Sequence, residues 1–97
     1  MTELNPSSPS SVRRFLSAAG IRPSRRLGQS FLVDQGTAAR IVAASGLVAG
    51  ETCLEIGPGL GALTDALAVA GARVTAVEVD HRLAAALKDR YRDNPSV

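Results

Sequence analysis

From residue 52 onward, the hydrophobic pattern changes its period in a regular order. Residues 52–56 are a short, mostly apolar run of the kind that forms a buried strand. Residues 60–67 then place apolar side chains every three or four positions, and Gly71 closes this predicted helix. Residues 73–79 are rich in β-branched side chains and predict a second strand, after which Asp80 can cap another helix. The positions that repeat on the apolar faces of the two predicted helices are Leu60, Leu63, Thr64, Leu67, Leu83, Leu87 and Tyr91.

The first half of the chain has a weaker pattern and predicts two helices. Residues 12–19 have apolar positions at helical spacing and are followed by Gly20. A second helix follows Asp34, a possible N-cap. We assign residues 1–22 to a polar and basic N-terminal tail with a short helix, and residues 23–97 to the first part of one domain. The helix after Asp34 has Ala38, Ile41, Val42 and Ser45 on one face and Gly46 at its left-handed end.

Strand, helix, strand, helix is a βαβα unit, so the fold class is α/β with parallel strands. Two parallel strands make an incomplete sheet, because such sheets are stable when helices cover both faces and other strands cover the edges. We therefore expect the 97 residues to be the first part of a larger domain. Taken alone, they should unfold with poor cooperativity.

The amino-acid composition excludes several kinds of binding site and cross-link. Aromatic residues are only 3% of the chain, too few for a platform that stacks single-stranded RNA bases. The single cysteine, Cys53, excludes an internal disulfide and a thiolate zinc cluster, and we predict no metal site. No apolar run is long enough to span a membrane, and the N-terminus lacks the pattern of a signal peptide, so we predict a cytoplasmic protein with no membrane partner.

Positive charge gathers at the N-terminal end. Residues 1–40 have a net charge of +4, whereas residues 41–97 have a net charge of −2. Clustered arginines such as Arg25 and Arg26 can neutralise the phosphates of a nucleic acid. The other interpretation, a solvated tail without a ligand, stays equally open.

Candidate chemistry lies where the first strand passes into a helix, at residues 57–61 (Gly-Pro-Gly-Leu-Gly). Open α/β sheets bind ligands at this position, and glycines let a ligand lie against the main chain. Glu78 follows the first glycine by 21 positions, at the tip of the second strand, where an acid can accept hydrogen bonds from a ribose diol. Together these features predict an adenosine-containing cofactor, against the alternatives of a purely structural turn and a solvated Glu78. With Ala62 in last place the segment also fits the looser dinucleotide pattern, so its spacing does not choose the cofactor.

Glu55 is an acid inside an otherwise apolar strand, two residues before the glycines. A buried carboxylate is costly unless it is paired. The ammonium group of a methionine moiety, reached directly or through water, would be a partner, and this favours a methionine-bearing nucleoside. Hydrogen bonds from loop N–H groups are the alternative.

Three segments together resemble the ribosomal RNA adenine N6-dimethyltransferase family. They are residues 26–34 (Arg-Leu-Gly-Gln-Ser-Phe-Leu-Val-Asp), residues 54–64 (Leu-Glu-Ile-Gly-Pro-Gly-Leu-Gly-Ala-Leu-Thr) and residues 76–80 (Ala-Val-Glu-Val-Asp). The likeness covers most of the chain, from about residue 23 to residue 97. It implies the N-terminal portion of a Rossmann-like, S-adenosylmethionine-dependent methyltransferase fold.

The resemblance also implies roles for single residues. The cofactor contacts would be Ser30, Leu32, Gly57 and Glu78, with Gly59 in the loop beneath the methionine part. The family usually has Asn or His at position 30, and the shorter Ser30 offers fewer hydrogen bonds. The family's adenine-binding acid and the segment that holds the target base would lie beyond Val97, so we expect no catalytic residue in this chain and no activity of the chain alone.

The substrate implied by the resemblance is a pair of neighbouring adenines in small-subunit ribosomal RNA, methylated by an enzyme that is monomeric when complete. Three other functions remain open: a large-subunit rRNA adenine methyltransferase of the macrolide-resistance type, a nicotinamide- or flavin-dependent oxidoreductase, and a non-catalytic RNA-binding module. His81, the only histidine, is expected to be an exposed first-turn residue, and Cys53 a buried small hydrophobe.

Overall fold

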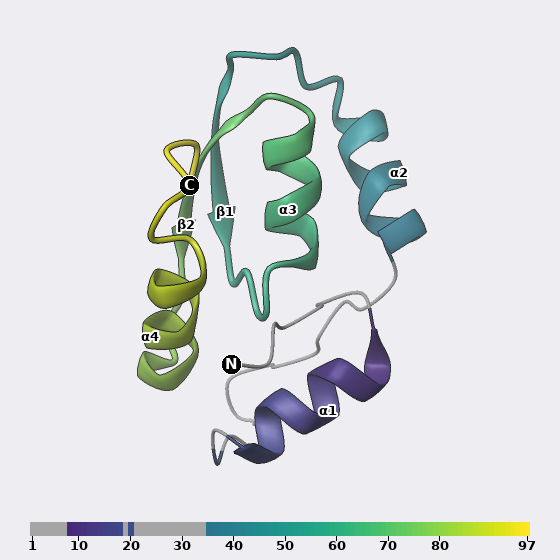
Figure 1. Cartoon of the computed structure of the whole chain (residues 1–97). Helices are drawn as coiled ribbons and strands as arrows, with labels where there is room; N and C mark the ends of the chain where they lie inside the picture. The colour runs from purple at the N-terminus through teal and green to yellow at the C-terminus, as the bar shows by residue number, and fades with distance from the viewer. Residues whose placement is uncertain (1–7, 19, 21–34) are drawn as a thin grey trace.

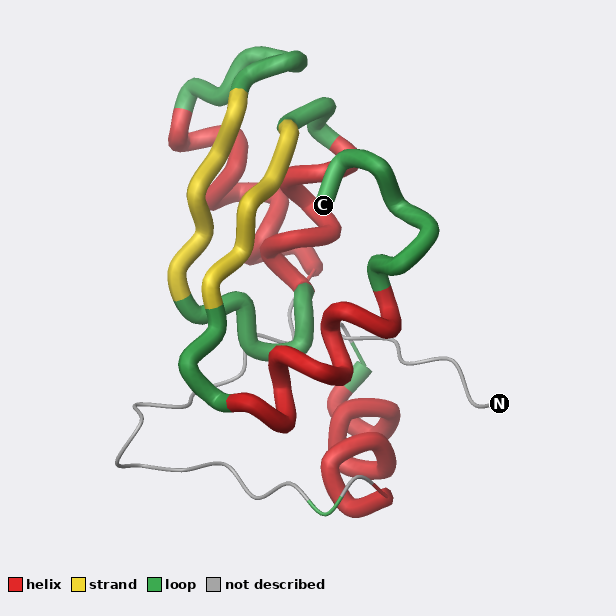
Figure 2. The backbone as a smooth tube through the Cα atoms, turned by 90° about the vertical axis from the view of Figure 1, so that its left-hand side faces the viewer, coloured by secondary structure: helices red, strands yellow, loops and turns green. Residues whose placement is uncertain are grey.

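The structure is a computed structural model that describes residues 8–18, 20 and 35–97 (Figure 1). The strands β1 (Thr52–Ile56) and β2 (Arg73–Val77) pair in parallel (Figure 2), with Thr52 opposite Arg73 and Ile56 opposite Val77. The α/β order and the parallel pairing predicted from the sequence are therefore confirmed. The elements, in chain order, are α1 (Pro9–Ala18), α2 (Gln35–Ser45), β1 (Thr52–Ile56), α3 (Ala62–Val69), β2 (Arg73–Val77) and α4 (His81–Arg90).

Only one face of the sheet is covered by the helices of the described residues. On this face Glu55 and Val74 are buried, at 7% and 5% exposure. On the opposite face Leu54, Ile56 and Val77 are 64%, 72% and 49% exposed. The prediction that residues 52–56 form a buried strand is therefore wrong for this outer face, because side chains alternate along a strand and no described element packs against the outer set.

The larger apolar cluster lies between α2, α3 and the covered face of the sheet. Val42, Leu67 and Val74 are its largest buried members, and Ala72 joins them. Cys53 is only partly buried and packs at the margin of this cluster. Ile41 was predicted on the buried face of its helix, but it is 45% exposed, because α2 turns Ala38 and Val42 inward.

A second apolar cluster joins α1 to the far end of the sheet. Val12 and Leu16 pack against Leu60, in the turn after β1, and against Leu83 of α4. Figure 1 shows α1 lying below this turn. The N-terminal helix thus lies next to the carboxyl ends of both strands.

The helix α1 begins at Pro9, three residues earlier than predicted. The Ser8 Oγ accepts a hydrogen bond from the Ser11 N–H at 3.3 Å, as an N-cap side chain does. Proline fits the first helical position because its missing N–H would have no helical partner there. The end predicted at residue 19 and the cap predicted at residue 34 lie outside the described residues.

The strand β2 ends at Val77, two residues earlier than predicted, because the chain turns at Glu78 to enter α4. Asp80 caps α4 as predicted, since its side chain accepts hydrogen bonds from the N–H groups of Arg82 and Leu83. The free edge of β2 is met by the last residues of the chain, where the Val74 N–H donates to the Ser96 carbonyl at 2.6 Å. No helix among the described residues is long and apolar enough to cross a membrane.

Candidate functional site

The turn between β1 and α3 is built on glycines in the left-handed region. Gly57, Gly59 and Gly61 have φ values of 71°, 60° and 97°. A β-carbon at Gly57 would meet no atom within 4 Å among residues 8–18, 20 and 35–97, so within this part of the chain that side of the turn is open. A β-carbon at Gly61 would collide with the side chains of Arg90 and Tyr91. The first glycine leaves room for a ligand, and the last one allows close packing within the protein.

Glu78 lies directly beside this turn. Its Oε1 accepts a hydrogen bond from the Gly59 N–H at 3.3 Å, and its Oε2 accepts one from the Asp80 N–H at 3.0 Å. The two backbone donors fix the direction of the carboxylate, and each oxygen keeps capacity to accept another hydrogen bond. The structure thus brings Glu78 against Gly59, in the turn that begins at Gly57, 21 positions before Glu78 in the sequence.

The start of α3 completes this end of the sheet. Gly61 is its N-cap and offers no side chain to the first N–H groups of the helix. These N–H groups and the helix dipole give the turn a partial positive charge, which suits a carboxylate or phosphate. Gly57 also continues the pairing of the strands, since its N–H donates to the Val77 carbonyl at 2.8 Å.

Glu55 is buried under the turn and has a partner that neither interpretation of the sequence named. The Thr64 Oγ1 donates to the Glu55 Oε1 at 2.5 Å. Burial raises the pKa of the Glu55 carboxyl above its ordinary value; the Thr64 hydrogen bond opposes this rise and the nearby Asp65 carboxylate adds to it. Thr64 was placed among apolar helix positions, and its pairing across nine residues has no local sequence signal.

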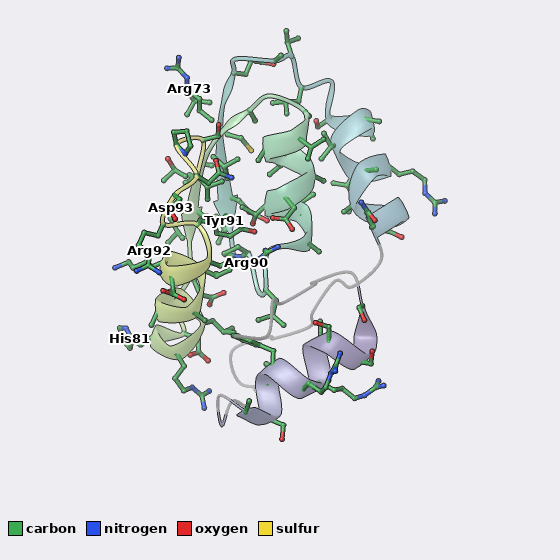
Figure 3. The ribbon with its side chains drawn as sticks, in the orientation of Figure 1. Arg73, His81, Arg90, Tyr91, Arg92 and Asp93 are labelled. Atoms are coloured by element: carbon green, nitrogen blue, oxygen red, sulfur yellow. The ribbon has the colours of Figure 1, made fainter. Side chains whose placement is uncertain are left out.

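Arg90 and Tyr91, at the end of α4, contact the same turn from its packed side (Figure 3). The Arg90 Nη1 donates to the Leu60 carbonyl at 3.2 Å, and the Arg90 Nη2 pairs with the Asp65 Oδ2 at 2.7 Å. The Tyr91 hydroxyl lies 2.6 Å from the Asp65 Oδ1 and 3.1 Å from the Gly61 carbonyl. Burial and then the hydrogen bond to Asp65 raise the pKa of Tyr91, against the effect of the Arg90 charge. The sequence analysis missed this group, because Tyr91 was taken as an apolar helix position.

A groove of about 450 Å³ runs between β2 and α4 and reaches Glu78 at one end. Its walls include Val74, Ala76 and Leu87, with Val97 from the end of the chain. The Glu78 carboxylate therefore borders open space as well as the glycine turn.

The remaining predicted residues have mixed outcomes. Ser30 and Leu32 lie outside the described residues, as do Arg25 and Arg26. His81 is the exposed first residue of α4, as predicted, and points away from the turn (Figure 3). Within residues 8–18, 20 and 35–97, no three His, Cys, Asp or Glu side chains are grouped so as to hold a metal ion.

Comparison with known proteins identifies the family. The sequence model of the ribosomal RNA adenine dimethylase family matches residues 21–97. The chain belongs to this family. The match includes the glycine turn, Glu55, Glu78 and the Arg90–Tyr91 pair, so the site described above lies within the dimethylase domain.

Several curated dimethylase relatives carry the name ribosomal RNA small subunit methyltransferase A. The protein of Leifsonia xyli subsp. xyli is 50% identical over 84 residues, which are 87% of this chain and 30% of the relative. The protein of Deinococcus radiodurans is 53% identical over 76 residues, or 78% of this chain and 26% of the relative. The protein of Thermobifida fusca is 48% identical over 86 residues, or 89% of this chain and 30% of the relative. The chain thus spans about 30% of the length of the curated relatives that it matches.

Proposed function

We propose that this chain is the cofactor-binding part of an S-adenosylmethionine-dependent rRNA adenine N6-dimethyltransferase. In this proposal residues 23–97 are the N-terminal portion of a Rossmann-like methyltransferase fold. The observation that carries it is the Glu78 carboxylate, held 3.3 Å from the Gly59 N–H at the carboxyl ends of two parallel strands. An acid beside a glycine turn at this end of a sheet is the arrangement that binds the ribose of a nucleoside.

The residues present fit S-adenosylmethionine, which supplies the methyl group when it is bound. Glu78 would accept hydrogen bonds from the two ribose hydroxyls. The open side of Gly57 leaves space for the methionine part, and the start of α3 would face its carboxylate. Ser30 and Leu32 are proposed as further contacts from the segment before α2.

The proposed substrate is small-subunit ribosomal RNA, at a pair of neighbouring adenines. This part of the proposal is supported by the names of the relatives and by the exposed Arg13 and Arg14 on α1, a helix whose apolar side packs beside the glycine turn. We propose that the target-base pocket is built by residues that follow position 97 in the relatives. The cytoplasm is the proposed location, and the complete enzyme is proposed to act as a monomer.

The cofactor that is bound distinguishes the proposed function from two of the alternatives left open by the sequence. An oxidoreductase would bind NADH at the same turn, and a non-catalytic RNA-binding module would bind neither cofactor. A large-subunit rRNA methyltransferase would share the cofactor and differ in the RNA that it methylates.

The test uses a chimaera in which this chain replaces the segment that it matches in the Leifsonia xyli relative, so that the rest of the sheet is present. Calorimetry should show binding of S-adenosylhomocysteine and no binding of NADH. Glu78→Gln should weaken S-adenosylhomocysteine about tenfold, the loss of about 1.4 kcal/mol expected for a hydrogen bond to a charged group. Glu51→Gln, which alters an exposed carboxylate at the other end of β1, is the control and should bind as the unsubstituted chimaera does. Equal binding by Glu78→Gln, or binding of NADH alone, would contradict the proposal.

A further inference from the structure

The end of α4 contacts the backbone of the glycine turn at Leu60 and Gly61, whereas a β-carbon at Gly57 would meet no atom of the described residues. Three side chains take part: Arg90, Tyr91 and Asp65, here called the turn clasp. We propose that the turn clasp positions the N–H groups of the glycine turn for the cofactor, so that Arg90, Tyr91 and Asp65 are positioning residues that set cofactor affinity without touching the cofactor. This inference rests on the proposed function.

The turn clasp contacts two consecutive carbonyls. Arg90 donates to the Leu60 carbonyl at 3.2 Å. The Tyr91 hydroxyl lies 3.1 Å from the Gly61 carbonyl and shares its one proton between this carbonyl and the nearer Asp65 Oδ1. The Tyr91 hydroxyl also accepts a hydrogen bond from the Arg90 Nη1 at 2.6 Å. The Asp65 carboxylate accepts hydrogen bonds from both the Tyr91 hydroxyl and the Arg90 guanidinium, so each member of the turn clasp contacts the other two. The guanidinium lies 4.9 Å from the centre of the Tyr91 ring, within range of a cation–π contact.

Because the peptide group is planar, contacts that hold a carbonyl also set the direction of the N–H group of the next residue. In a trans peptide the carbonyl and the N–H of the next residue point in opposite directions. With the Gly61 carbonyl directed at Tyr91 and at the Asp65 N–H, the Ala62 N–H points away from the clasp, at the first position of α3. The turn clasp therefore fixes the plane of the peptide group between Gly61 and Ala62, and with it the direction of the Ala62 N–H at the start of α3.

The turn clasp packs so closely against the turn that position 61 has no room for a side chain. A β-carbon at Gly61 would fall on the Tyr91 hydroxyl and 2.6 Å from the Arg90 Nη1, so only glycine permits the contact. The Arg90–Asp65 pair is partly shielded, at 24% and 37% side-chain exposure, which strengthens it relative to a fully exposed pair. By contrast, Arg92 on the same helix end pairs with Asp89 on the surface.

The first experiment measures amide hydrogen exchange in the full 97-residue chain without cofactor. Tyr91→Phe removes only the hydroxyl, and it should speed exchange in residues 59–62 about three- to tenfold, the range for one lost hydrogen bond, while β1 and α2 keep their rates. Arg92→Gln is the matched control and should leave residues 59–62 unchanged. Faster exchange by the same factor throughout the chain would show a role in fold stability alone and would overturn the proposal.

The second experiment measures S-adenosylhomocysteine affinity in the chimaera, at a temperature where each variant is fully folded. Tyr91→Phe and Arg90→Gln should each weaken binding about three- to tenfold, in line with one hydrogen bond, and Arg90→Lys should recover part of the loss. Binding by Tyr91→Phe equal to that of the unsubstituted chimaera would overturn the positioning role and leave the proposed function standing. Failure of the unsubstituted chimaera to bind would refute the proposed function, and the inference with it.

Discussion

The hydroxyl of Thr64 lies 2.5 Å from the carboxylate of Glu55, in the interior between β1 and α3. This pair ties the strand before the glycine turn to the helix after it. Glu55 is only 7% exposed, so its negative charge is poorly solvated. The stability of the turn should therefore respond to pH through this one carboxyl group.

The first prediction concerns that pH response. Burial raises the folded-state pKa of Glu55 above its ordinary value of 4.5. The stabilisation from this group is thus complete below pH 4.5, where Glu55 is protonated in both states, and is lost as pH rises through the higher folded-state pKa. Glu55→Gln should remove this loss and melt at a higher temperature than the unsubstituted chain at pH 7, but not at pH 4. Melting curves across this range test it, and parallel curves for the two proteins would contradict it.

A second prediction uses Thr64→Val, which keeps the shape of the side chain and removes the donor. The buried Glu55 carboxylate then loses its hydrogen bond, which should cost about 1–3 kcal/mol of unfolding free energy at pH 7. In the Glu55→Gln background the same change should cost less, because no charge is left unpaired. A double-mutant cycle by denaturant unfolding of the chimaera, in which the rest of the sheet is present, measures the difference, and strictly additive effects would refute the pairing.

The third prediction separates two glycines of the turn. Gly61→Ala should destabilise the protein by about 2–3 kcal/mol, from about 1–2 kcal/mol for a left-handed alanine and about 1 kcal/mol for the displaced Tyr91 hydrogen bond. The β-carbon of Gly57→Ala meets no atom of the described residues, so this change should cost only the left-handed penalty of about 1–2 kcal/mol. In the chimaera, however, Gly57→Ala should weaken S-adenosylhomocysteine about tenfold, or about 1.4 kcal/mol, because the methyl group enters the cofactor's space. Unchanged affinity would remove Gly57 from the site.

The fourth prediction concerns RNA. Arg13 and Arg14 are exposed on α1, whose apolar side packs beside the glycine turn. Reversing both charges to Glu should weaken binding of a small-subunit rRNA hairpin and lower the salt slope by about 1 for each phosphate that is no longer neutralised. Arg73→Glu is the control: it is exposed at the other end of the sheet (Figure 3) and should keep the slope. An unchanged slope in the double variant would exclude α1 from the RNA surface.

The fifth prediction concerns the uncovered face of the sheet. Leu54 and Ile56 expose apolar side chains beside Val77. The isolated chain should therefore self-associate at high concentration and melt over a broad range. Leu54→Thr with Ile56→Thr should reduce the association seen in sedimentation. A sharp two-state melt of a monomeric chain would contradict this expectation.

The sequence predicted the elements after residue 52 well, because their periods are local properties. Asp80 as the cap of α4, and Gly71 as the left-handed residue just after the Ala70 C-cap of α3, depend only on neighbouring residues. The start of α1 was also signalled locally, by the Ser8–Pro9 pair, but the polar composition of residues 1–11 obscured it.

The features that the sequence did not predict depend on distant partners. The burial of each face of β1 depends on what covers the sheet, which a strand pattern alone does not state. The hydrogen bond of Tyr91 with Asp65 joins residues 26 positions apart, and helical periodicity gave no reason to separate Tyr91 from Leu83 and Leu87. A hydrogen bond that the sequence did not predict joins Gly59 and Glu78, whereas their role in binding a cofactor stays a prediction.

The residue-by-residue pairing from Thr52 with Arg73 to Ile56 with Val77 has a consequence for how this protein can change. Adding or deleting one residue within either strand would rotate every following side chain to the opposite face and move Glu78 by about 3.3 Å along the strand. Length changes should therefore be tolerated in residues 46–51, at the opposite end of the sheet, and selected against between residues 52 and 78. The number of residues between the glycine turn and Glu78 should therefore stay constant among homologous chains, even where the segments outside residues 52–78 differ in length.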